Sequence, residues 1–104
     1  MSKTNPSPNL RPGQLVYSTQ GRDRGQAYLV YQNVAKTNFV LLVDGKKRTL
    51  KNPKKKNIKH LQGARWVAAE LEKRFPAGAS VANEAIQEAI NTGIKAVKEG
   101  SLLG

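Results

Sequence analysis

The chain has 104 residues, no cysteine and a formal net charge of +11. This length accommodates one small domain with a short appendage and leaves little room for an enclosed catalytic cleft. The lack of cysteine excludes disulfides and thiolate metal sites, and it fits a reducing compartment. No apolar run approaches the roughly 20 residues that span a bilayer, and the polar residues 1–12 do not resemble a secretory signal. We therefore expect a cytoplasmic protein without a membrane partner, in which residues 1–12 form a flexible arm.

The positive charge is concentrated in one part of the chain. Residues 1–62 carry 13 lysines and arginines against two acids, Asp23 and Asp44. Residues 63–104 carry five basic and five acidic side chains, so their charges cancel. This asymmetry predicts a polyanionic partner for the first part and an ordinary solvated surface for the second.

The first part alternates β-prone segments with turns. Residues 14–18, 27–32 and 39–43 are rich in β-branched and aromatic side chains, which predicts three strands. Between the first two, the sequence Gly-Arg-Asp-Arg-Gly at residues 21–25 predicts a turn with glycine at positive φ.

A hairpin is expected next. Asp44-Gly45 supplies the positive φ angles that a two-residue type I′ turn needs, so residues 46–50 are predicted to be the returning strand. Asn52-Pro53 should interrupt the ladder because proline lacks an amide donor, and residues 58–61 could add a last short strand. Several short strands at this spacing predict a small barrel, which closes on itself and hides its edges.

The second part, which begins near Gln62-Gly63, has a helical composition. Residues 64–75 predict one helix that Pro76 ends, with Trp66 packing this helix onto the barrel. Ser80 is a candidate N-cap for a second helix that runs to about Glu99, with Gly100 at its C-cap. One face of this helix carries an apolar stripe, formed by Ala82, Ala85, Ile86, Ala89, Ile90, Gly93, Ile94 and Val97.

Residues 46–59 form the main candidate binding segment, because they include eight basic side chains and no acid. Ammonium groups on flexible stems pair well with phosphate oxygens, and the release of condensed counterions favours binding. The alternative is a solvated, solubilising face, but the density of charge and the neutral second part favour phosphate binding. The basic residues are Lys46, Lys47, Arg48, Lys51, Lys54, Lys55, Lys56 and Lys59.

A second candidate contact is the turn at residues 21–25. Its two arginines, Arg22 and Arg24, can form bidentate contacts with phosphate or with a guanine edge, while Asp23 either holds one of them or caps the turn. The strand aromatics are expected to pack in the core more often than to stack on unpaired bases. These aromatics are Tyr17, Tyr28, Tyr31 and Phe39.

The sequence does not indicate an enzyme, a cofactor or a metal site. His60 is the sole histidine and has no cysteine or nearby carboxylate to complete a metal site, so we expect a further phosphate or base contact or a surface residue. No paired acid and base, nucleophile motif, P-loop or dinucleotide fingerprint is present. We therefore expect a non-enzymatic protein without a small-molecule substrate.

Several of these segments together resemble a known family. Gly13-Gln14-Leu15-Val16, followed by residues 21–26 and an apolar strand, resembles the KOW motif of ribosomal proteins and elongation factors, and Gly25 matches its characteristic glycine. The continuation through residues 43–48, 52–56 and His60-Leu61 is similar to small bacterial KOW-domain RNA-binding proteins, which are related to KOW-class ribosomal proteins of the archaeal and eukaryotic large subunit. Asn83-Glu84-Ala85-Ile86 resembles the start of the C-terminal helix of that bacterial family.

The resemblance implies an SH3-like barrel of KOW type at residues 13–62, followed by a C-terminal extension of two helices at residues 63–104. It also implies an RNA-binding, ribosome-associated protein that binds ribosomal RNA or the large subunit, with ribosomal proteins as further partners of the helices. Two alternatives stay open: a protein–protein adaptor of the translation or transcription machinery, and a nonspecific DNA binder. The expected RNA contacts are Arg22, Arg24, Gly25, Gln26, Lys46, Lys47, Arg48, Lys51, Lys54, Lys55, Lys56, Lys59 and His60.

Overall fold

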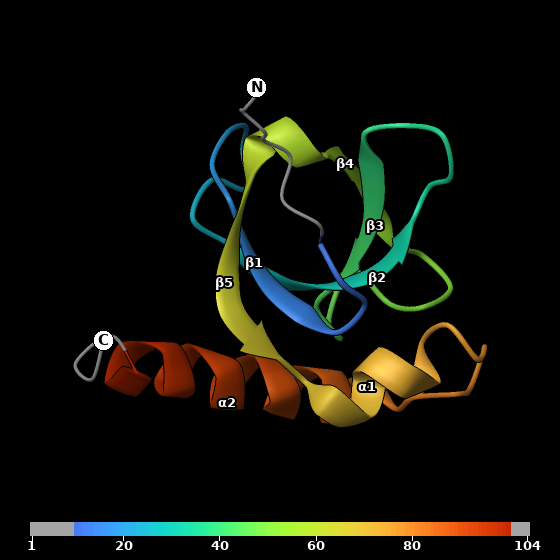
Figure 1. Ribbon diagram of the computed structural model, residues 1–104, viewed down its shortest axis with the longest axis vertical. Helices are drawn as coiled ribbons and strands as arrows, with labels where there is room; N and C mark the ends of the chain where they lie inside the picture. Colours follow the sequence, from blue (N-terminus) through green and yellow to red (C-terminus); the bar gives the residue numbers. More distant parts are fainter. Residues whose placement is uncertain (1–9, 101–104) are drawn as a thin grey trace, which may run out of the picture.

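The computed structural model describes residues 10–100, and within this range the chain forms one five-stranded antiparallel sheet followed by helices. The strand order is β4-β3-β2-β1-β5, so that β1, early in the chain, lies between β2 and the last strand. Figure 1 shows the strands curving around a common interior, with α1 and α2 together along one side of the sheet. The elements are β1 (Gln14–Ser18), β2 (Ala27–Asn33), β3 (Phe39–Val43), β4 (Lys54–Asn57), the 3₁₀ turn η1 (Ile58–His60), β5 (Leu61–Val67), α1 (Ala69–Arg74) and α2 (Asn83–Gly100).

The sheet buries apolar side chains on both of its faces, because successive residues of a strand point to opposite sides. In β1, for example, Leu15 and Val16 are both fully buried but belong to different clusters. The first cluster packs between the sheet and the helices and contains Leu15, Leu29, Val43, Ala68, Leu71, Phe75, Ile86 and Ile90. The second lies on the other face and contains Leu10, Val16, Tyr28, Val30, Val40 and Leu42.

The helices are held on the sheet by aromatic contacts. Phe75 is fully buried, and its ring meets Tyr31 of β2 edge to face at a centroid distance of 5.1 Å. Trp66 of β5 packs against Gly93 of α2, where a Cβ atom would lie only 2.5 Å from the indole. The prediction that Trp66 belongs to the first helix and packs it onto the barrel is therefore wrong. Trp66 lies in β5 and packs against the second helix, α2. The stripe of α2 lies against the core from Ile86 onward, but Ala82 and Ala85 are exposed.

The β-rich first part and the helical end are confirmed. The predicted strands at residues 14–18 and 39–43 match β1 and β3, and β2 extends one residue beyond its predicted end at residue 32. No helix within residues 10–100 combines the length and apolar character that a bilayer crossing requires.

The hairpin predicted at Asp44-Gly45 is wrong in its returning strand. Residues 46–50 are not a strand, and the partner of β3 is β4, which begins directly after Pro53. The reason is that the Asp44 side chain accepts hydrogen bonds from the backbone amides of Lys46 and Arg48, which a hairpin ladder would otherwise use.

The predictions for residues 58–75 are also corrected. Residues 58–60 form a 3₁₀ turn, whose start the side chain of Asn57 caps by accepting from the Lys59 amide, and the last strand is β5. This strand runs through the expected domain boundary at residues 62 and 63, so the sheet extends to Val67 and the first helix begins at Ala69. The second helix begins at Asn83 instead of directly after Ser80.

Of the predicted arm at residues 1–12, residues 1–9 lie outside the described residues. Residues 10–12 are part of the fold, beginning with Leu10, which is buried in the second cluster. Arg11 is ion-paired with Glu72 of α1, and its Nε donates to the same carboxylate at 2.7 Å. The prediction of a flexible arm is therefore wrong for residues 10–12.

Candidate nucleic-acid interface

Asp23, in the turn between β1 and β2, fastens this turn to the edge strand β4. The Lys56 ammonium lies 2.6 Å from Oδ1 of Asp23 and also donates to the backbone carbonyl of Gln20 at 2.8 Å. Lys54, two residues earlier on the same face of β4, lies 3.5 Å from the other carboxylate oxygen. The turn with Arg22 and Arg24 and the strand with Lys54, Lys55 and Lys56 are therefore brought side by side.

The Asp23 carboxylate has further partners inside the fold. The Ser18 hydroxyl donates to Oδ1 at 2.8 Å, and the Tyr28 hydroxyl donates to Oδ2 at 2.7 Å. Burial alone raises the pKa of Asp23, but the hydrogen bonds from Lys56, Tyr28 and Ser18, together with the charge of Lys54, hold this pKa well below its usual range. Burial and the hydrogen bond to Asp23 raise the pKa of Tyr28 above its usual value. Asp23 thus remains ionised and Tyr28 remains protonated.

Asp44 organises the second basic segment. Its Oδ1 accepts from the amides of Lys46 and Arg48 at 2.8 and 2.9 Å, and its own amide donates to the carbonyl of Arg48 at 2.8 Å. Its Oδ2 accepts from the side chain of Gln26 at 3.2 Å, which ties this loop to the end of the β1–β2 turn. Asp44 therefore shapes the lysine-rich loop and connects it to the arginine turn.

The lysine-rich loop also rests on the start of α2. Gly45 is buried with φ of +76°, and a Cβ atom there would lie 2.5 Å from the carbonyl oxygen of Asn83. The side chain of Gln87 donates to the carbonyl of Gly45 at 2.6 Å. Helix α2 is thus a support for the loop that presents Lys46 and Lys47.

The contacts of Asp23 and Asp44 connect the two predicted contact regions, which we together call the basic surface: the β1–β2 turn (residues 19–26), residues 44–53 and β4. His60 and Lys59 lie in η1, which continues from β4. The predicted contacts that are exposed are Arg22, Arg24, Gly25, Gln26, Lys46, Lys47, Lys51, Lys55 and Lys59, whereas Arg48, Lys54 and His60 are half-buried.

Lys56 is the exception among the predicted contacts. Only 9% of the residue is exposed, and its ammonium is occupied by Asp23 and by the Gln20 carbonyl. A phosphate could reach this group only by displacing those partners. Lys56 is therefore a structural residue and is removed from the set of candidate contacts.

The strand aromatics are mostly structural, as expected. Tyr28 is buried, and Tyr17 and Tyr31 pack against the helix-side cluster. Phe39 is half-buried, and the Lys55 ammonium lies 4.9 Å from the centre of its ring, within the range of a cation–π contact. Phe39 thus positions a lysine of the basic surface.

Two arginines outside the predicted contacts line a groove along β5 together with Lys59. The sequence places Arg11 in the arm and Arg65 in a helix, and so does not indicate this position. The available signal for Arg65 was the β propensity of its neighbours Trp66 and Val67, which the helical spacing of alanines outweighed.

Among residues 10–100, no cluster of three or more histidine, cysteine or carboxylate side chains could hold a metal ion. A scan against protein-family models found no match for this chain. A search of curated proteins likewise found no significant relative.

Proposed function

We propose that this protein binds RNA through the basic surface. The observation that carries the proposal is the use of the two carboxylates in the first part of the chain. Asp23 is committed to Lys54 and Lys56, and Asp44 is committed to backbone amides and Gln26. Within residues 10–100, the exposed cations of this surface are consequently not ion-paired with a carboxylate. They are Arg22, Arg24, Lys46, Lys47, Lys51 and Lys55.

Phosphate is the chemistry that such a surface fits. Uncompensated cations spread over two loops and a strand raise the local concentration of a polyanion, and each phosphate contact releases condensed counterions. If about four to six of them contact phosphates, log K should fall with log salt at roughly −0.9 per contact on a duplex, or −0.7 on a single strand.

We also propose that the fold is a KOW-type SH3-like barrel and that the RNA partner is ribosomal RNA. Closure of the sheet is supported by the shortness of η1, because only these three residues separate β4 and β5, the strands at the two ends of the strand order. Ile58 and Leu61, at the junction of β4 with β5, pack against the second cluster. The choice of RNA, the cytoplasm and the large ribosomal subunit is supported by the sequence resemblance to KOW-domain proteins.

The central test measures binding of a fluorescent, structured RNA at several salt concentrations. Replacing Lys47 and Lys51 with alanine removes two exposed cations of the basic surface and should flatten the salt slope by about 1.4 to 1.8. The matched control replaces Lys73 and Lys95, two exposed lysines of α1 and α2, and should leave affinity and slope nearly unchanged. Equal loss in both variants would refute a localised interface, because it would mean that only net charge matters.

Two further measurements separate RNA from the other partners. Binding of structured RNA and of duplex DNA of the same length is compared at one salt concentration, and tighter binding of DNA would refute the choice of RNA. Cell lysate is then sedimented at low and high salt. Salt-sensitive comigration with the large ribosomal subunit would support the ribosomal setting, whereas a partner kept after nuclease and high salt would indicate an adaptor.

A further inference from the structure

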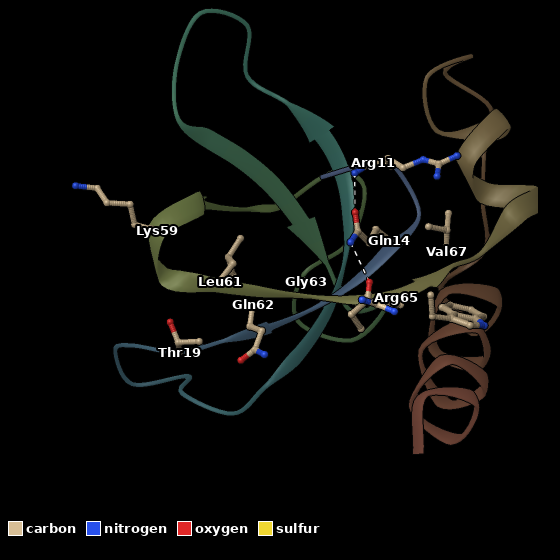
Figure 2. A pocket seen from close by; sticks show the side chains of 11 residues that line it. Arg11, Gln14, Thr19, Lys59, Leu61, Gln62, Gly63, Arg65 and Val67 are labelled. Atoms are coloured by element: carbon tan, nitrogen blue, oxygen red, sulfur yellow. Dashed lines mark hydrogen bonds between the residues drawn. The ribbon is translucent and has the colours of Figure 1, made fainter. Parts of the chain in front are cut away.

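An open groove with a volume of about 730 Å³ follows β5. Figure 2 shows Lys59 beside one end of this strand, Gln62 and Arg65 along it, and Arg11 toward the other end. Thr19 and Gln62 add polar groups to the lining, and Trp66 adds an aromatic one. The groove therefore combines cations, hydrogen-bonding side chains and an aromatic ring along an extended strand.

The groove is shaped by an irregularity in the pairing of β1 with β5. Gln14 pairs with Val67 and Val16 pairs with Gly63, so two additional residues of β5 are accommodated between these pairs. The Gln14 side chain secures this bulge, because its Nε2 donates to the Ala64 carbonyl at 2.9 Å and its Oε1 accepts from the Arg11 amide at 2.9 Å (Figure 2). The bulged segment that presents Arg65 is thus held in place by defined hydrogen bonds.

The lining carries positive charge without an acidic residue. Arg11, Lys59 and Arg65 line the groove, and none of the lining residues is an aspartate or a glutamate. The charge of Arg11 is compensated by Glu72, so the net attraction comes from Lys59 and Arg65. Lys59 also adjoins the basic surface, and the groove therefore begins where that surface ends.

We propose that the groove binds a single-stranded, extended segment of nucleic acid that continues from the RNA on the basic surface. This inference rests on the proposed function and adds a second contact to it. The seven residues of β5 extend over roughly 23 Å at about 3.3 Å per residue. That length suits about four nucleotides, with Lys59 and Arg65 on phosphates and the polar side chains on sugars or base edges.

The test compares two RNAs that differ only in a single-stranded tail. One is a short hairpin, and the other is the same hairpin with a 3′ or 5′ tail of about eight uridines. The wild-type protein should bind a tailed hairpin more tightly than the blunt one. Replacing Arg65 with alanine should reduce this gain by roughly tenfold and its salt slope by about 0.7, while leaving affinity for the blunt hairpin unchanged.

Two controls make the result specific. Lys73→Ala removes an exposed cation of α1 and should preserve the gain from the tail. Lys47→Ala, on the basic surface, should weaken binding of blunt and tailed hairpins by the same factor. A thermal unfolding temperature of Arg65→Ala equal to that of wild type verifies its fold, and Arg65→Lys should restore most of the gain.

A direct readout comes from Trp66, the sole tryptophan of the chain, because it lines the groove. The tailed hairpin should change its fluorescence and the blunt hairpin should not.

The outcomes distinguish the two proposals. Failure to bind either hairpin refutes the proposed function. Binding of the blunt hairpin with no gain from either tail, or a gain that Arg65→Ala preserves, overturns the groove alone. Displacement of the tail by an oligoglutamate peptide at equal charge concentration would also overturn it, because the occupant would then be any acidic chain.

Discussion

The Lys56 ammonium and the Asp23 carboxylate lie 2.6 Å apart, although 33 residues separate them in the sequence. Both side chains are close to buried, with about a tenth of each exposed to solvent. This pair makes the position of the arginine turn depend on the edge strand β4. The acid between Arg22 and Arg24 in the sequence is therefore part of the scaffold that positions these cations.

Asp23 should make stability sensitive to acid. Because the pKa of Asp23 is lowered in the folded state, its stabilisation is fully present above the unfolded-state pKa of about 4 and is lost as the pH falls below that value. In Asp23→Asn this part of the dependence should disappear, and the free energy of unfolding at neutral pH should fall by about 2 to 3 kcal/mol. Unfolding curves between about pH 7 and about pH 3 measure both effects. A wild-type acid dependence retained in the variant would contradict the assignment.

Lys55 and Lys56 are adjacent but should respond differently to substitution. Lys56→Ala leaves Asp23 without its closest counterion and should lower the free energy of unfolding by about 1 to 3 kcal/mol. Lys55→Ala removes an exposed cation and should weaken RNA binding with little change in stability. Denaturant unfolding and RNA titration of both variants form the comparison. Equal stability of the two variants would mean that the Asp23–Lys56 pair contributes nothing measurable.

Gly25 and Gly45 offer a matched test of how the loops are built. Both have positive φ, at +89° and +76°, so alanine at either position costs about 1 to 2 kcal/mol in backbone strain. A Cβ atom at Gly25 would meet no described atom within 4 Å, whereas at Gly45 it would collide with the start of α2. Gly45→Ala should therefore be more destabilising than Gly25→Ala, by at least about 1 kcal/mol. Urea unfolding measures both variants, and the unfolding midpoint of Gly45→Ala should lie at a lower urea concentration than that of Gly25→Ala. The reverse order would contradict the close packing of Gly45 against α2.

Gly93 and Gly100 form a corresponding pair in α2. Alanine generally favours a helix over glycine by about 0.8 to 1 kcal/mol. At Gly100 a Cβ atom would have open space among the described residues, so Gly100→Ala should be neutral or stabilising. At Gly93 it would overlap the Trp66 ring, and Gly93→Ala should destabilise by about 1 to 3 kcal/mol and shift the tryptophan emission. A stabilised Gly93→Ala variant would show that α2 does not pack on Trp66 this closely.

The strands β1, β2 and β3 could be predicted because their side chains carry the information locally. Val16, Val30 and Val40, for instance, are β-branched residues in short runs bounded by turns, and all three are fully buried. The glycines at residues 21 and 25 likewise predict the turn between them, and both have positive φ in the structure. Local pattern therefore suffices where an element's residues favour one conformation and no distant contact competes.

The segment after Asp44 could not be predicted from local pattern. The Asp44 carboxylate accepts amides only two and four residues ahead, a side-chain interaction that the Asp-Gly hairpin pattern does not indicate. Gly45 packs against α2, an element about 40 residues away. Likewise, residues 64–67 have helical spacing with the apolar side chains that follow, but pairing with β1 extends them as a strand. For the candidate interface, the sequence indicates which region is basic, but the burial of Lys56 and the position of Arg65 beside the β5 groove follow only from the three-dimensional arrangement.

The strand order also has a consequence for the timing of folding during synthesis. β1 is flanked by β2 and β5, and its register with β5 joins Val16 to Gly63. At about 5 to 20 residues per second, roughly 2 to 10 s pass between the synthesis of these two partners. Until β5 emerges, one edge of β1 and the apolar side chains of the sheet lack their final neighbours. The nascent chain therefore displays its cations before the sheet that arranges them is complete.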